Sequence, residues 1–516
     1  MESHYDVVII GGALAGASMG LLLKRARPET RVLIVERAEA FDFKVGESTS
    51  EVGAAFLTRG LGLGSWLARE QIAKNGLRFW FQTDGNTDVA ACSEFGPRMQ
   101  VRLPAFQLDR SKLDEHVLAL AKSAGCDVRR PATVRELEFG GAGKNKISIA
   151  VAGQELETVT AGWVVDASGK AAVIARKRGT LEVLKDHPTN SMWCRFRGVR
   201  DLDDGTLAAG SACFRDRTWG VRATATNHLT GYGWWAWIIP LQGGEMSVGI
   251  TWDRRLYEPP KEGTIPERLV SALKGHALGA WLMEDATPLA EDAHYYSQLA
   301  YRSMDVMGDG WAAVGDAAGF MDPLYSHGID FIGHTVWSVR AILLDALNGE
   351  CVKERAVAYS RQYQESYMRW FDALYRDKYR YLGDEELMRA AIFMDIGCYF
   401  LGPVRLIYGD MDKELSVLPY NGPIGAAVGK FMRFYNRRFA ALAEVRRSKG
   451  IWGRKNLRNH CVFASSFVPT FAVRSLIVKG MWLWLKCEIS TRLAPRRAAE
   501  AVAIAASPAV EARSQV

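Results

Sequence analysis

The chain lacks several features that would assign it to a common protein class. Its eight cysteines form no C-x-x-C pair and no metal-ligand spacing, so the sequence predicts reduced thiols and no metal site. Arg474 and Lys479 interrupt the longest apolar stretch of the C-terminal part, and we expect no transmembrane span. No basic segment or cleavage site precedes the first apolar strand at Val7–Ile10. These absences favour a cytoplasmic protein.

Positive charge is concentrated near the C-terminus. Residues 430–497 contain 16 Lys and Arg but only Glu444 and Glu488, a local charge of +14 in a chain whose net charge is +7. The rest of the chain therefore carries about −7. Aromatic residues interleave with the basic ones, so this region can contact an anionic membrane, contact an acidic carrier protein, or form a solvated helical face. No recognised nucleic-acid module accompanies the charge, and we expect no nucleic-acid partner.

The N-terminus has the pattern of a nucleotide-binding βαβ unit. An apolar strand leads into the glycine turn Gly11–Gly16, a helix of small residues follows, and a second strand ends at Glu36. Such a turn places a phosphate at the helix N-terminus, and Glu36 lies 20 residues after Gly16, where a carboxylate can bind ribose hydroxyls. Ala13 stands where the second glycine of this fingerprint is expected, which is a mild departure.

Further elements follow from periodicity. We predict a helix over residues 51–73, a strand over 77–82 and a helix over 328–347. Residues 187–300 are rich in alternating apolar and polar positions, which favours a β-sheet module, and the chain is predicted to be mostly helical after about residue 378. A chain of 516 residues is too long to fold around a single hydrophobic core, so we expect several modules.

Three more segments specify the nucleotide. Gln107 and Arg110 lie at the start of a helix, Asp166 follows a strand, and the run Gly315, Asp316, Ala317, Ala318 follows another. An acid at a strand end beside small residues suits a hydroxyl of a ribityl chain. Over residues 5–350 the chain resembles the flavoprotein monooxygenase and halogenase superfamily, in which the Gly-Asp-Ala-Ala segment holds FAD.

The resemblance implies an α/β fold: a Rossmann-like FAD-binding domain of the aromatic hydroxylase type, an inserted β-sheet substrate module and a helical C-terminal region. The corresponding segments are 1–186 and 301–380 for the FAD domain, 187–300 for the module and 381–516 for the basic helical region. The residues that it assigns to FAD are Gly11, Ala13, Ala15, Gly16, Glu36, Arg37, Lys44, Glu47, Ser48, Gln107, Arg110, Asp166, Gly315, Asp316, Pro323 and Gly328.

Local strings within the superfamily are similar to flavin-dependent halogenases, particularly the branch that acts on phenols and pyrroles. One is Lys44–Ser48, which resembles a flavin-contacting Gly-Glu-Ser segment. Another is the W-x-W-x-I-P string of Trp235, Trp237, Ile239 and Pro240, although alternating Trp and Ile also suit an ordinary half-buried strand. A looser match, Lys74 to Phe79, resembles the K-x-G-x-x-F segment that carries the active-site lysine.

By this resemblance Lys74 is the candidate catalytic residue. In the family, reduced FAD and molecular oxygen form a hydroperoxide that oxidises chloride or bromide to hypohalous acid, which a lysine then holds or activates. A surface lysine that closes a helix is the alternative for Lys74. The backbone amides of His327 and Gly328 match the halide-binding position, but His327 replaces the small residue expected there and could instead cap the following helix.

The predicted function is reduced-FAD-dependent halogenation of an electron-rich aromatic compound, either a phenol, a pyrrole or a carrier-bound aryl group. A separate flavin reductase is the expected partner, and a peripheral contact with the inner membrane face through the basic region stays open. Three alternatives remain at this point. They are an aromatic hydroxylase that oxidises NAD(P)H itself, an isoprenoid reductase with a similar Gly315–Phe320 run, and a flavin-binding protein without turnover.

Overall fold

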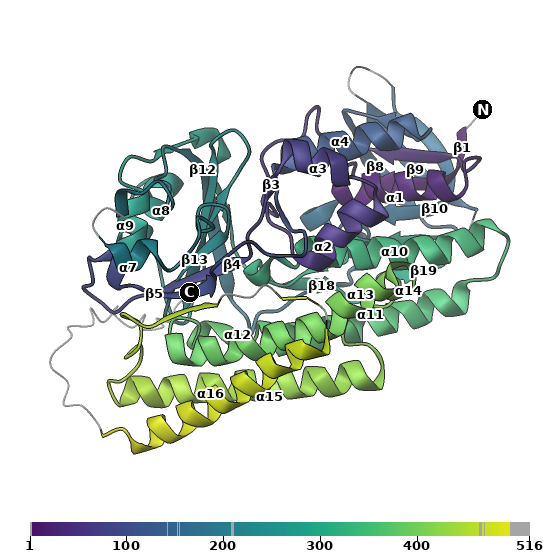
Figure 1. Cartoon of the computed structure of the whole chain (residues 1–516). Helices are drawn as coiled ribbons and strands as arrows, with labels where there is room; N and C mark the ends of the chain where they lie inside the picture. The colour runs from purple at the N-terminus through teal and green to yellow at the C-terminus, as the bar shows by residue number, and fades with distance from the viewer. Residues whose placement is uncertain are drawn as a thin grey trace, which may run out of the picture.

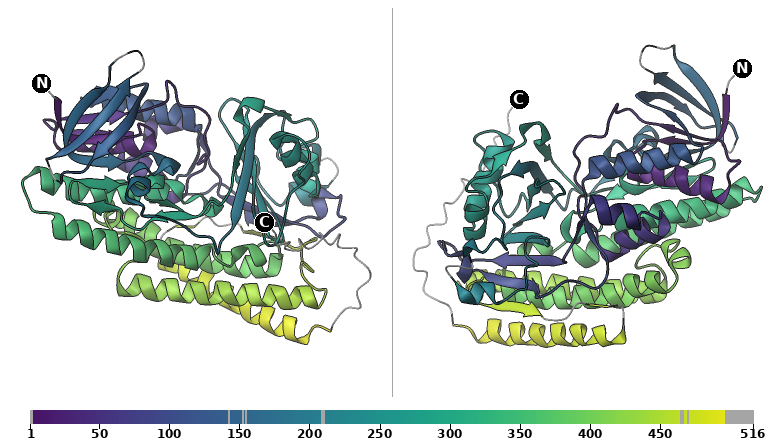
Figure 2. Two further views of the ribbon diagram at one scale, coloured as in Figure 1. Left: turned by 180° about the vertical axis from the view of Figure 1, so that it is seen from behind. Right: turned by 45° about the horizontal axis from the view of Figure 1, so that its top comes forward.

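The computed structural model describes residues 3–141, 143–151, 153, 155–207, 211–463, 467–468 and 470–495. Two lobes stand side by side, each built on a β-sheet, and a layer of long helices runs beneath them (Figures 1 and 2). The first lobe contains the N-terminal strand β1, and the second contains β12 and β13 (Figure 1).

The first lobe is a parallel βαβ arrangement extended by an antiparallel hairpin. β1 pairs in parallel with β10 and β2, so Ile10 lies opposite Asp166 on one side and Val35 on the other. The carboxyl ends of these strands meet at one edge, where sheets of this kind bind ligands. The strand order is β19 (Met307–Gly308), β20 (Trp311–Ala313), β10 (Glu157–Asp166), β1 (Ser3–Ile10), β2 (Val32–Val35) and β7 (Asp127–Arg129), with β8 (Ala132–Glu138) and β9 (Asn145–Val151) as the hairpin.

Short elements complete this lobe. Asp109 is the N-cap of the helix that was predicted to follow Gln107, and its carboxylate accepts a hydrogen bond from the backbone N–H of Ser111 at 3.1 Å. The helices are α1 (Leu14–Ala26), α4 (Arg110–Ser123) and α5 (Val173–Arg178), and a small sheet consists of β11 (Leu181–Val183), β18 (Tyr301–Ser303) and β21 (Gly319–Phe320).

The second lobe is a nine-stranded sheet whose strands come from three parts of the chain. Residues 187–300 supply β12 (Thr189–Arg197), β13 (Thr226–Gly231), β14 (Trp234–Pro240), β15 (Met246–Asp253), β16 (Thr287–Pro288) and β17 (His294–Tyr296). Earlier and later segments add β4 (Leu77–Phe81), β5 (Ser93–Pro97) and β22 (His460–Phe463). The helices α7 (Ala212–Arg215), α8 (Ile265–Lys274) and α9 (Ala277–Leu282) belong to this lobe (Figure 1). The four-segment domain division stays a prediction.

The helix predicted over residues 51–73 is interrupted, so that prediction was wrong in its extent. Gly62 has a φ of +73°, a left-handed conformation that a glycine adopts without strain. The helix therefore ends before Gly62 and a new one starts at Gly64. The segment consists of α2 (Glu51–Ala55), a π-helical turn (Phe56–Gly60), α3 (Gly64–Glu70) and β3 (Ile72–Ala73), which pairs with β6 (Phe106–Gln107).

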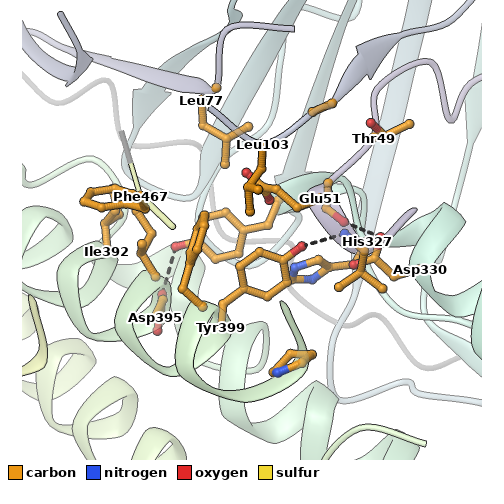
Figure 3. Close-up of a pocket in the computed structure, with 18 of the residues that line it drawn as sticks. Thr49, Glu51, Leu77, Leu103, His327, Asp330, Ile392, Asp395, Tyr399 and Phe467 are labelled. Carbon is orange, nitrogen blue, oxygen red and sulfur yellow. Dashed lines mark hydrogen bonds between the residues drawn. The ribbon is translucent and has the colours of Figure 1, made fainter. Parts of the chain in front are cut away.

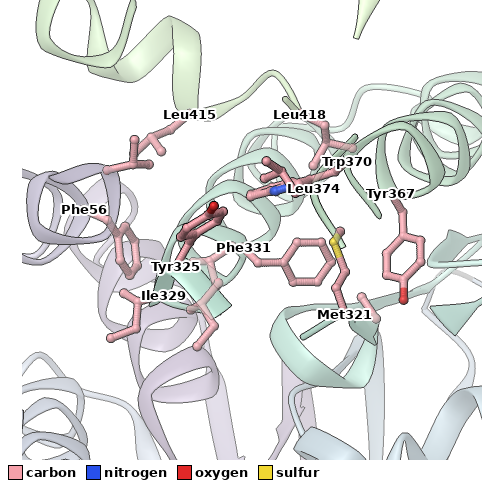
Figure 4. Close-up of a cluster of buried hydrophobic side chains, with 14 of the residues drawn as sticks. Phe56, Met321, Tyr325, Ile329, Phe331, Tyr367, Trp370, Leu374, Leu415 and Leu418 are labelled. Atoms are coloured by element: carbon pink, nitrogen blue, oxygen red, sulfur yellow. The ribbon is translucent and has the colours of Figure 1, made fainter. Parts of the chain in front are cut away.

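The helical layer is held by a core of large side chains. Phe331 and Trp370 pack edge to face, with ring centroids 6.2 Å apart, and they join α10 to α11 (Figure 4). The main helices are α10 (Gly328–Leu347), α11 (Lys353–Leu374), α12 (Glu385–Tyr399), α15 (Gly422–Ser448) and α16 (Arg474–Leu493), with α13 (Arg405–Gly409) and α14 (Met411–Leu415) as short connections. The helix predicted over residues 328–347 is thus confirmed as α10.

One helical run, Glu385–Gly409, is long and apolar enough to cross a membrane by length and composition. Of its most apolar stretch, 56% is buried inside the protein, as in the core helix of a folded domain. All eight cysteines are free thiols. Within the described ranges, no group of three or more His, Cys, Asp or Glu could hold a metal.

A buried ion cluster fixes the edge of the second sheet. The carboxylate of Glu94 in β5 accepts hydrogen bonds from Arg78, Arg217 and Arg222, including one of 2.8 Å from Nε of Arg222. Burial is the largest influence on Glu94 and raises its pKa, but the arginines outweigh it and lower the pKa to about 2. The cluster joins β4 and β5 to the segment before β13.

We predict that Glu94→Gln lowers the free energy of unfolding by about 3–5 kcal/mol, because it leaves buried guanidinium groups without a counter-charge. Urea unfolding near neutral pH measures this change. The wild-type contribution is present above pH ~4.5, the ordinary pKa of glutamate, and is lost as pH falls toward about 2. The half-exposed pair of Glu157 and Arg129 provides the control, since Glu157→Gln should cost only about 0–1 kcal/mol. Equal losses in the two variants would contradict this account.

Candidate functional site

Two cavities lie at the junction of the lobes and the helical layer. Cavity A has a volume of about 320 Å³ and lies between the strand ends of the first lobe and the sheet of the second. Cavity B has a volume of about 130 Å³ and lies between the second lobe and the helices. Residues that line cavity A include Ala13, Leu14, Ala15, Arg37, Lys44, Val45, Gly46, Glu47, Ser48, Arg110, Ser168, Trp193, His228, Trp235, Trp237, Ile239, Asp316, Pro323, Ser326 and Gly328.

The glycine turn begins cavity A and leaves no room for other side chains at two places. A Cβ on Gly16 would lie 1.9 Å from the carbonyl oxygen of Gly11, and one on Gly11 would lie 2.4 Å from that of Ala167. Ala13, which stands in place of the expected second glycine, is the N-cap residue of α1. Its backbone is extended, with a φ of −70°, a conformation that alanine adopts without strain. Ala13 and Ala15 line the cavity, and the unpaired amides of the first turn of α1 give this end its anion-binding character.

Three predicted FAD residues act within the protein rather than on the cavity wall. Glu36 accepts hydrogen bonds from the backbone N–H groups of Gly12 at 2.7 Å and Ala38 at 2.8 Å. Asp166 accepts from Ser168 and from the N–H of Ile174, so its carboxylate fixes the turn into α5. Gln107 donates to Thr226 Oγ1 at 3.0 Å. All three shape the backbone that borders the cavity.

Charged groups of both signs face the middle of cavity A. Burial raises the pKa of Asp316, which follows the turn residue Gly315, and the nearby Lys44 and Arg110 act in the opposite direction. Lys44 is half-exposed and lies 3.8 Å from Asp114. The structure therefore places Lys44 on the wall of cavity A and not in cavity B, as the sequence comparison anticipated.

Glu47 has a partner that the sequence did not reveal. Nη2 of Arg195, in β12, donates to Oε1 of Glu47 at 2.6 Å and to Asp109 at 3.2 Å. Burial raises the pKa of Glu47 to about 7 against the attraction of Arg195. The neighbouring Ser48 shares a hydrogen bond of 2.9 Å with Thr226. These contacts attach the segment at 44–48 to the second lobe, and no sequence spacing links Arg195 to it.

The W-x-W-x-I-P string forms β14, and its side chains reach both cavity A and the helical layer. The indole N–H of Trp235 donates to Tyr379 Oη at 3.0 Å, and Tyr379 donates to Asp322 Oδ2 at 2.8 Å. Trp237 donates to Ser247 at 3.1 Å. Ile239 lines cavity A, and Pro240 ends the strand opposite Met246. The string is therefore strand-like, as the simpler interpretation held, but Trp235 also anchors the segment that begins at Asp322.

That segment, residues 322–328, is a strained turn between the two cavities. Tyr325 and Ser326 both have left-handed backbones, with φ of +70° and +64°. Such conformations cost about 1–3 kcal/mol each in non-glycine residues and persist where the surroundings enforce them. The left-handed conformation of Tyr325 is enforced by a hydrogen bond of 2.9 Å from its hydroxyl group to Asp395. Gly328 begins α10, so the amides of its first turn have no carbonyl partner within the helix.

His327 turns its ring away from cavity A and into the wall of cavity B. Its Nδ1 lies 2.9 Å from Tyr375 Oη, and its ring packs against Trp370 and Tyr399. Burial, with a smaller influence of Lys74, lowers its pKa to about 3, so the ring is neutral. His327 caps no backbone group of α10. The side chain of His327 therefore forms part of the wall of cavity B, whereas its backbone amide belongs to the turn at 322–328.

Cavity B is mostly apolar and aromatic (Figure 3). Leu77 and Leu103 face it from the second lobe and the adjoining loop, and Ile392 and Tyr399 face it from α12 (Figure 3). Its other apolar walls are Phe79, Phe95, Val101, Trp370, Leu374, Phe400, Pro403, Tyr420, Met432, Phe463 and Phe467. The acidic and basic side chains that line it are Glu51, Lys74, His327, Asp330, His334 and Asp395.

Lys74 lies in the wall that separates the cavities. Its Nζ donates to the carbonyl oxygen of Thr49 at 2.7 Å and lies 3.5 Å from Ser326 Oγ. Ser326 lines cavity A, whereas Lys74 and Thr49 line cavity B. Lys74 is only 4% exposed, so the alternative of a surface lysine that closes a helix is wrong. Burial lowers its pKa to about 8.

Two carboxyl groups, the buried Asp330 and the partly buried Glu51, accompany Lys74 and were not found from the sequence. Glu51 and Asp330 both line cavity B, and both oppose the effect of burial on the pKa of Lys74. Burial raises the pKa of Glu51, and it raises that of Asp330 to about 7. Asp330 also accepts from the N–H of Gly53 at 3.0 Å. Neither residue stands at a diagnostic spacing from Lys74, so only the fold brings them together.

Comparison with known proteins assigns the family. The sequence profile of the tryptophan halogenase family matches residues 93–376, more than half of the chain. A flavin-dependent halogenase, chlA, from Dictyostelium discoideum is 28% identical over 440 residues, which cover 77% of this chain and 70% of that protein. The 1H-pyrrole-2-carbonyl-(peptidyl-carrier protein) chlorinase from Pseudomonas fluorescens is 27% identical over 454 residues, 83% of this chain and 95% of that protein.

Solved structures show the same fold. The halogenase PltM in complex with phloroglucinol and FAD superposes with a TM-score of 0.73 at 17% identity, covering 94% of this chain and 98% of that one. The flavin-dependent brominase Bmp2 superposes with a TM-score of 0.63 at 22% identity, covering 84% of this chain and 100% of that one. The predicted Rossmann-like FAD-binding fold with a helical C-terminal region is confirmed. The chain belongs to the tryptophan halogenase family and is a flavin-dependent halogenase that uses FAD, halide and molecular oxygen to halogenate an aromatic substrate.

Proposed function

We propose that cavity B holds an apolar, electron-rich aromatic compound and that hypohalous acid formed beside cavity A reaches it past Lys74. The observation that carries the proposal is the position of Lys74 in the wall between the cavities, with Ser326 on one side and an aromatic cavity on the other. A phenol or pyrrole fits this cavity because its ring is a π-nucleophile and its surface is largely apolar. The same ring attached to a carrier is the second source of substrate.

FAD fits cavity A by several observations. The first turn of α1 offers amides to the pyrophosphate, and Asp316 and Arg110 flank the middle of the cavity. The indole N–H of Trp193 is buried on the lining and, among the described residues, has no hydrogen-bond partner. The residues proposed to hold FAD are Gly11, Ala13, Ala15, Gly16, Arg37, Lys44, Glu47, Ser48, Arg110, Gly315, Asp316, Pro323 and Gly328, with Glu36, Gln107 and Asp166 setting the backbone behind them.

Reduced FAD, supplied by a separate reductase, provides with oxygen the oxidising equivalent that converts halide to hypohalous acid. The proposed halide site is the pair of amides of His327 and Gly328, in the turn that lines both cavities. Amide dipoles hold an anion without the tight pairing that a cationic side chain would impose, so the halide keeps its nucleophilicity. His327 contributes no positive charge there because its ring is neutral.

Lys74 acts in this proposal as an ammonium group that donates a hydrogen bond to hypohalous acid. Two of its three N–H groups are directed to Thr49 and Ser326, which leaves one for the acid. Transfer of halogen to the ring then needs a base for the displaced ring proton. Glu51 lies in the same cavity and can accept that proton.

This arrangement favours halogenation over hydroxylation and reduction. A hydroxylase or reductase of a bound substrate needs no charged donor in a wall between two cavities, whereas diffusible hypohalous acid must be held where it enters the substrate cavity. The carrier contact, a cytoplasmic location and a peripheral contact of the basic C-terminal region with the inner membrane face remain proposals.

We predict that Lys74→Met lowers halogenation of the aromatic substrate by about a hundredfold or more. The variant should bind FAD normally and still release hypohalous acid to a small diffusible halogen acceptor, because the halide turn is unchanged. Product chromatography with and without the acceptor separates the two steps. The exposed Lys122 provides the control variant Lys122→Met, which should keep full activity. Normal transfer by Lys74→Met would exclude the lysine from the reaction.

The pH dependence gives a second prediction. Because Lys74 has a pKa of about 8, its ammonium form dominates below pH 8 and the neutral amine above it. With a substrate that does not ionise, kcat/KM should be constant at neutral pH and fall about tenfold per pH unit above pH 8. Glu51→Gln removes a carboxylate that raises the pKa of Lys74, so this fall should start at lower pH. An increase of kcat/KM with pH would instead favour the neutral amine as the reacting form.

The Trp235–Tyr379–Asp322 chain can be tested through halide affinity. Tyr379→Phe leaves the indole N–H and the carboxylate without their shared partner, and the turn at 322–328 should lose its position. We expect KM for halide to rise about fivefold to twentyfold, the equivalent of the ~1–2 kcal/mol cost of one unmade buried hydrogen bond. The control is Tyr363→Phe, since the hydroxyl of Tyr363 is buried with no hydrogen-bond partner among the described residues. Loss of stability without a change in halide KM would contradict the positioning role.

A further inference from the structure

Helix α16 buries its small residues and exposes its large apolar ones, the reverse of an ordinary surface helix. The buried side is formed by Gly480, Cys487 and Thr491, and a Cβ on Gly480 would lie 2.5 Å from Met394 Cγ of α12. The opposite side carries an apolar stripe at helical spacing, which we call the α16 face: Val478, Met481, Trp482, Leu485, Ile489 and Leu493. These six side chains are 46–78% exposed.

Helix α16 lies on the outside of the helical layer, crossing in front of α15 in Figure 1 and forming the lower edge of the molecule in the right view of Figure 2. Neighbouring elements extend it, because Phe471 just before the helix is 60% exposed and Phe434 of α15 is 61% exposed. The ring of Phe434 lies 5.8 Å from that of Trp484, which attaches α15 to α16 beside the stripe. A contiguous apolar patch of this size on a protein surface marks a site of interaction.

Basic groups surround the apolar stripe and outnumber the acids of the same region, although one of them, Arg492, lies 3.8 Å from Glu488. Arg474, Lys479, Lys486 and Arg492 are exposed on α16. The two acids of α15 and α16 already have partners, since Glu444 pairs with Arg380 at 2.9 Å and Glu488 pairs with Arg438 at 2.5 Å. The face therefore combines a hydrophobic stripe with a rim of positive charge.

We propose that the α16 face docks on an anionic lipid bilayer, with the helix lying in the plane of the interface. An apolar stripe with a tryptophan at its centre and Lys or Arg at its edges is the pattern of an interfacial helix. A second copy of the chain fits less well, because a twofold contact would bring the same basic rims together. An acidic carrier protein would pair with the basic groups, but it would not explain why the large aliphatic side chains of the α16 face are exposed.

The α16 face lies near cavity B, so a membrane contact there could deliver the substrate. This step rests on the proposed function, in which cavity B holds the substrate. Only α12 separates α16 from cavity B, because Ile392, Ile396 and Tyr399 line cavity B while Gly397 of the same helix packs on Ile477 of α16. The cavity-lining turn Phe400–Val404 also precedes Arg405, which stacks on Phe471 at the edge of the face. A lipid surface here would bring apolar aromatic compounds close to cavity B.

The test is flotation of the FAD-loaded full chain with vesicles of phosphatidylcholine containing about one third phosphatidylglycerol. Wild-type protein should float with these vesicles. Trp482→Gln with Leu485→Gln should weaken the partition at least about tenfold, as should Arg474→Glu with Lys486→Glu. The matched control is Trp219→Gln with Val357→Gln, two residues that are 63% exposed elsewhere on the surface and should not matter. FAD content and the unfolding temperature verify that each variant is folded.

Vesicle binding is measured without halide or substrate, so it stands or fails separately from halogenation. Failure of the wild-type protein to float at low ionic strength would overturn the proposal, as would equal flotation of the α16-face variants and the control. A dimer that the α16-face variants dissociate, in the absence of vesicle binding, would assign the face to a second copy instead. Flotation that falls at high salt and in both pairs of α16-face variants supports the bilayer.

Discussion

A buried ammonium group sets the main constraint on this molecule. Lys74 lies in a wall between two cavities, where burial disfavours its charge and the carboxyl groups of Glu51 and Asp330 favour it. The two acids come from α2 and α10, elements of different parts of the chain. The wall can exist only if the glycine-rich first lobe, the loop that carries Lys74 and the start of α10 are held in one arrangement. Much of the remaining packing can be understood as maintaining that arrangement.

The turn at 322–328 shows how the arrangement is maintained. Two consecutive left-handed residues would relax if they were free, but one hydrogen bond from Tyr325 to α12 and one from Tyr379 to Asp322 hold the turn from the helical side. The second lobe contributes through Trp235, which binds the same Tyr379. Both lobes and the helical layer thus meet at the segment where the halide is proposed to bind.

The sequence predicted what depends on local pattern and could not predict what depends on long-range contact. The βαβ unit, α10, the fold class and the family follow from glycine spacing, periodicity and short strings. The break near Gly62 was missed because a left-handed glycine looks like any other glycine in a helical pattern. Arg195, Glu51, Asp330 and Tyr379 were missed because each reaches its partner across many residues. The ring of His327 lines cavity B, which no sequence spacing indicated.

The separation of the two cavities has a consequence for how such an enzyme can change. Cavity A is built from the lobes, whereas much of the wall of cavity B comes from α11, α12 and the segments that follow them. With the substrate in cavity B, as proposed, substitutions in that C-terminal half would alter the shape of the accepted ring system while the oxidising chemistry stays intact. Asp395 is the exception. It lines cavity B but also accepts the hydrogen bond that holds Tyr325 in the turn at 322–328, so its substitution would change the substrate cavity and the proposed halide site together.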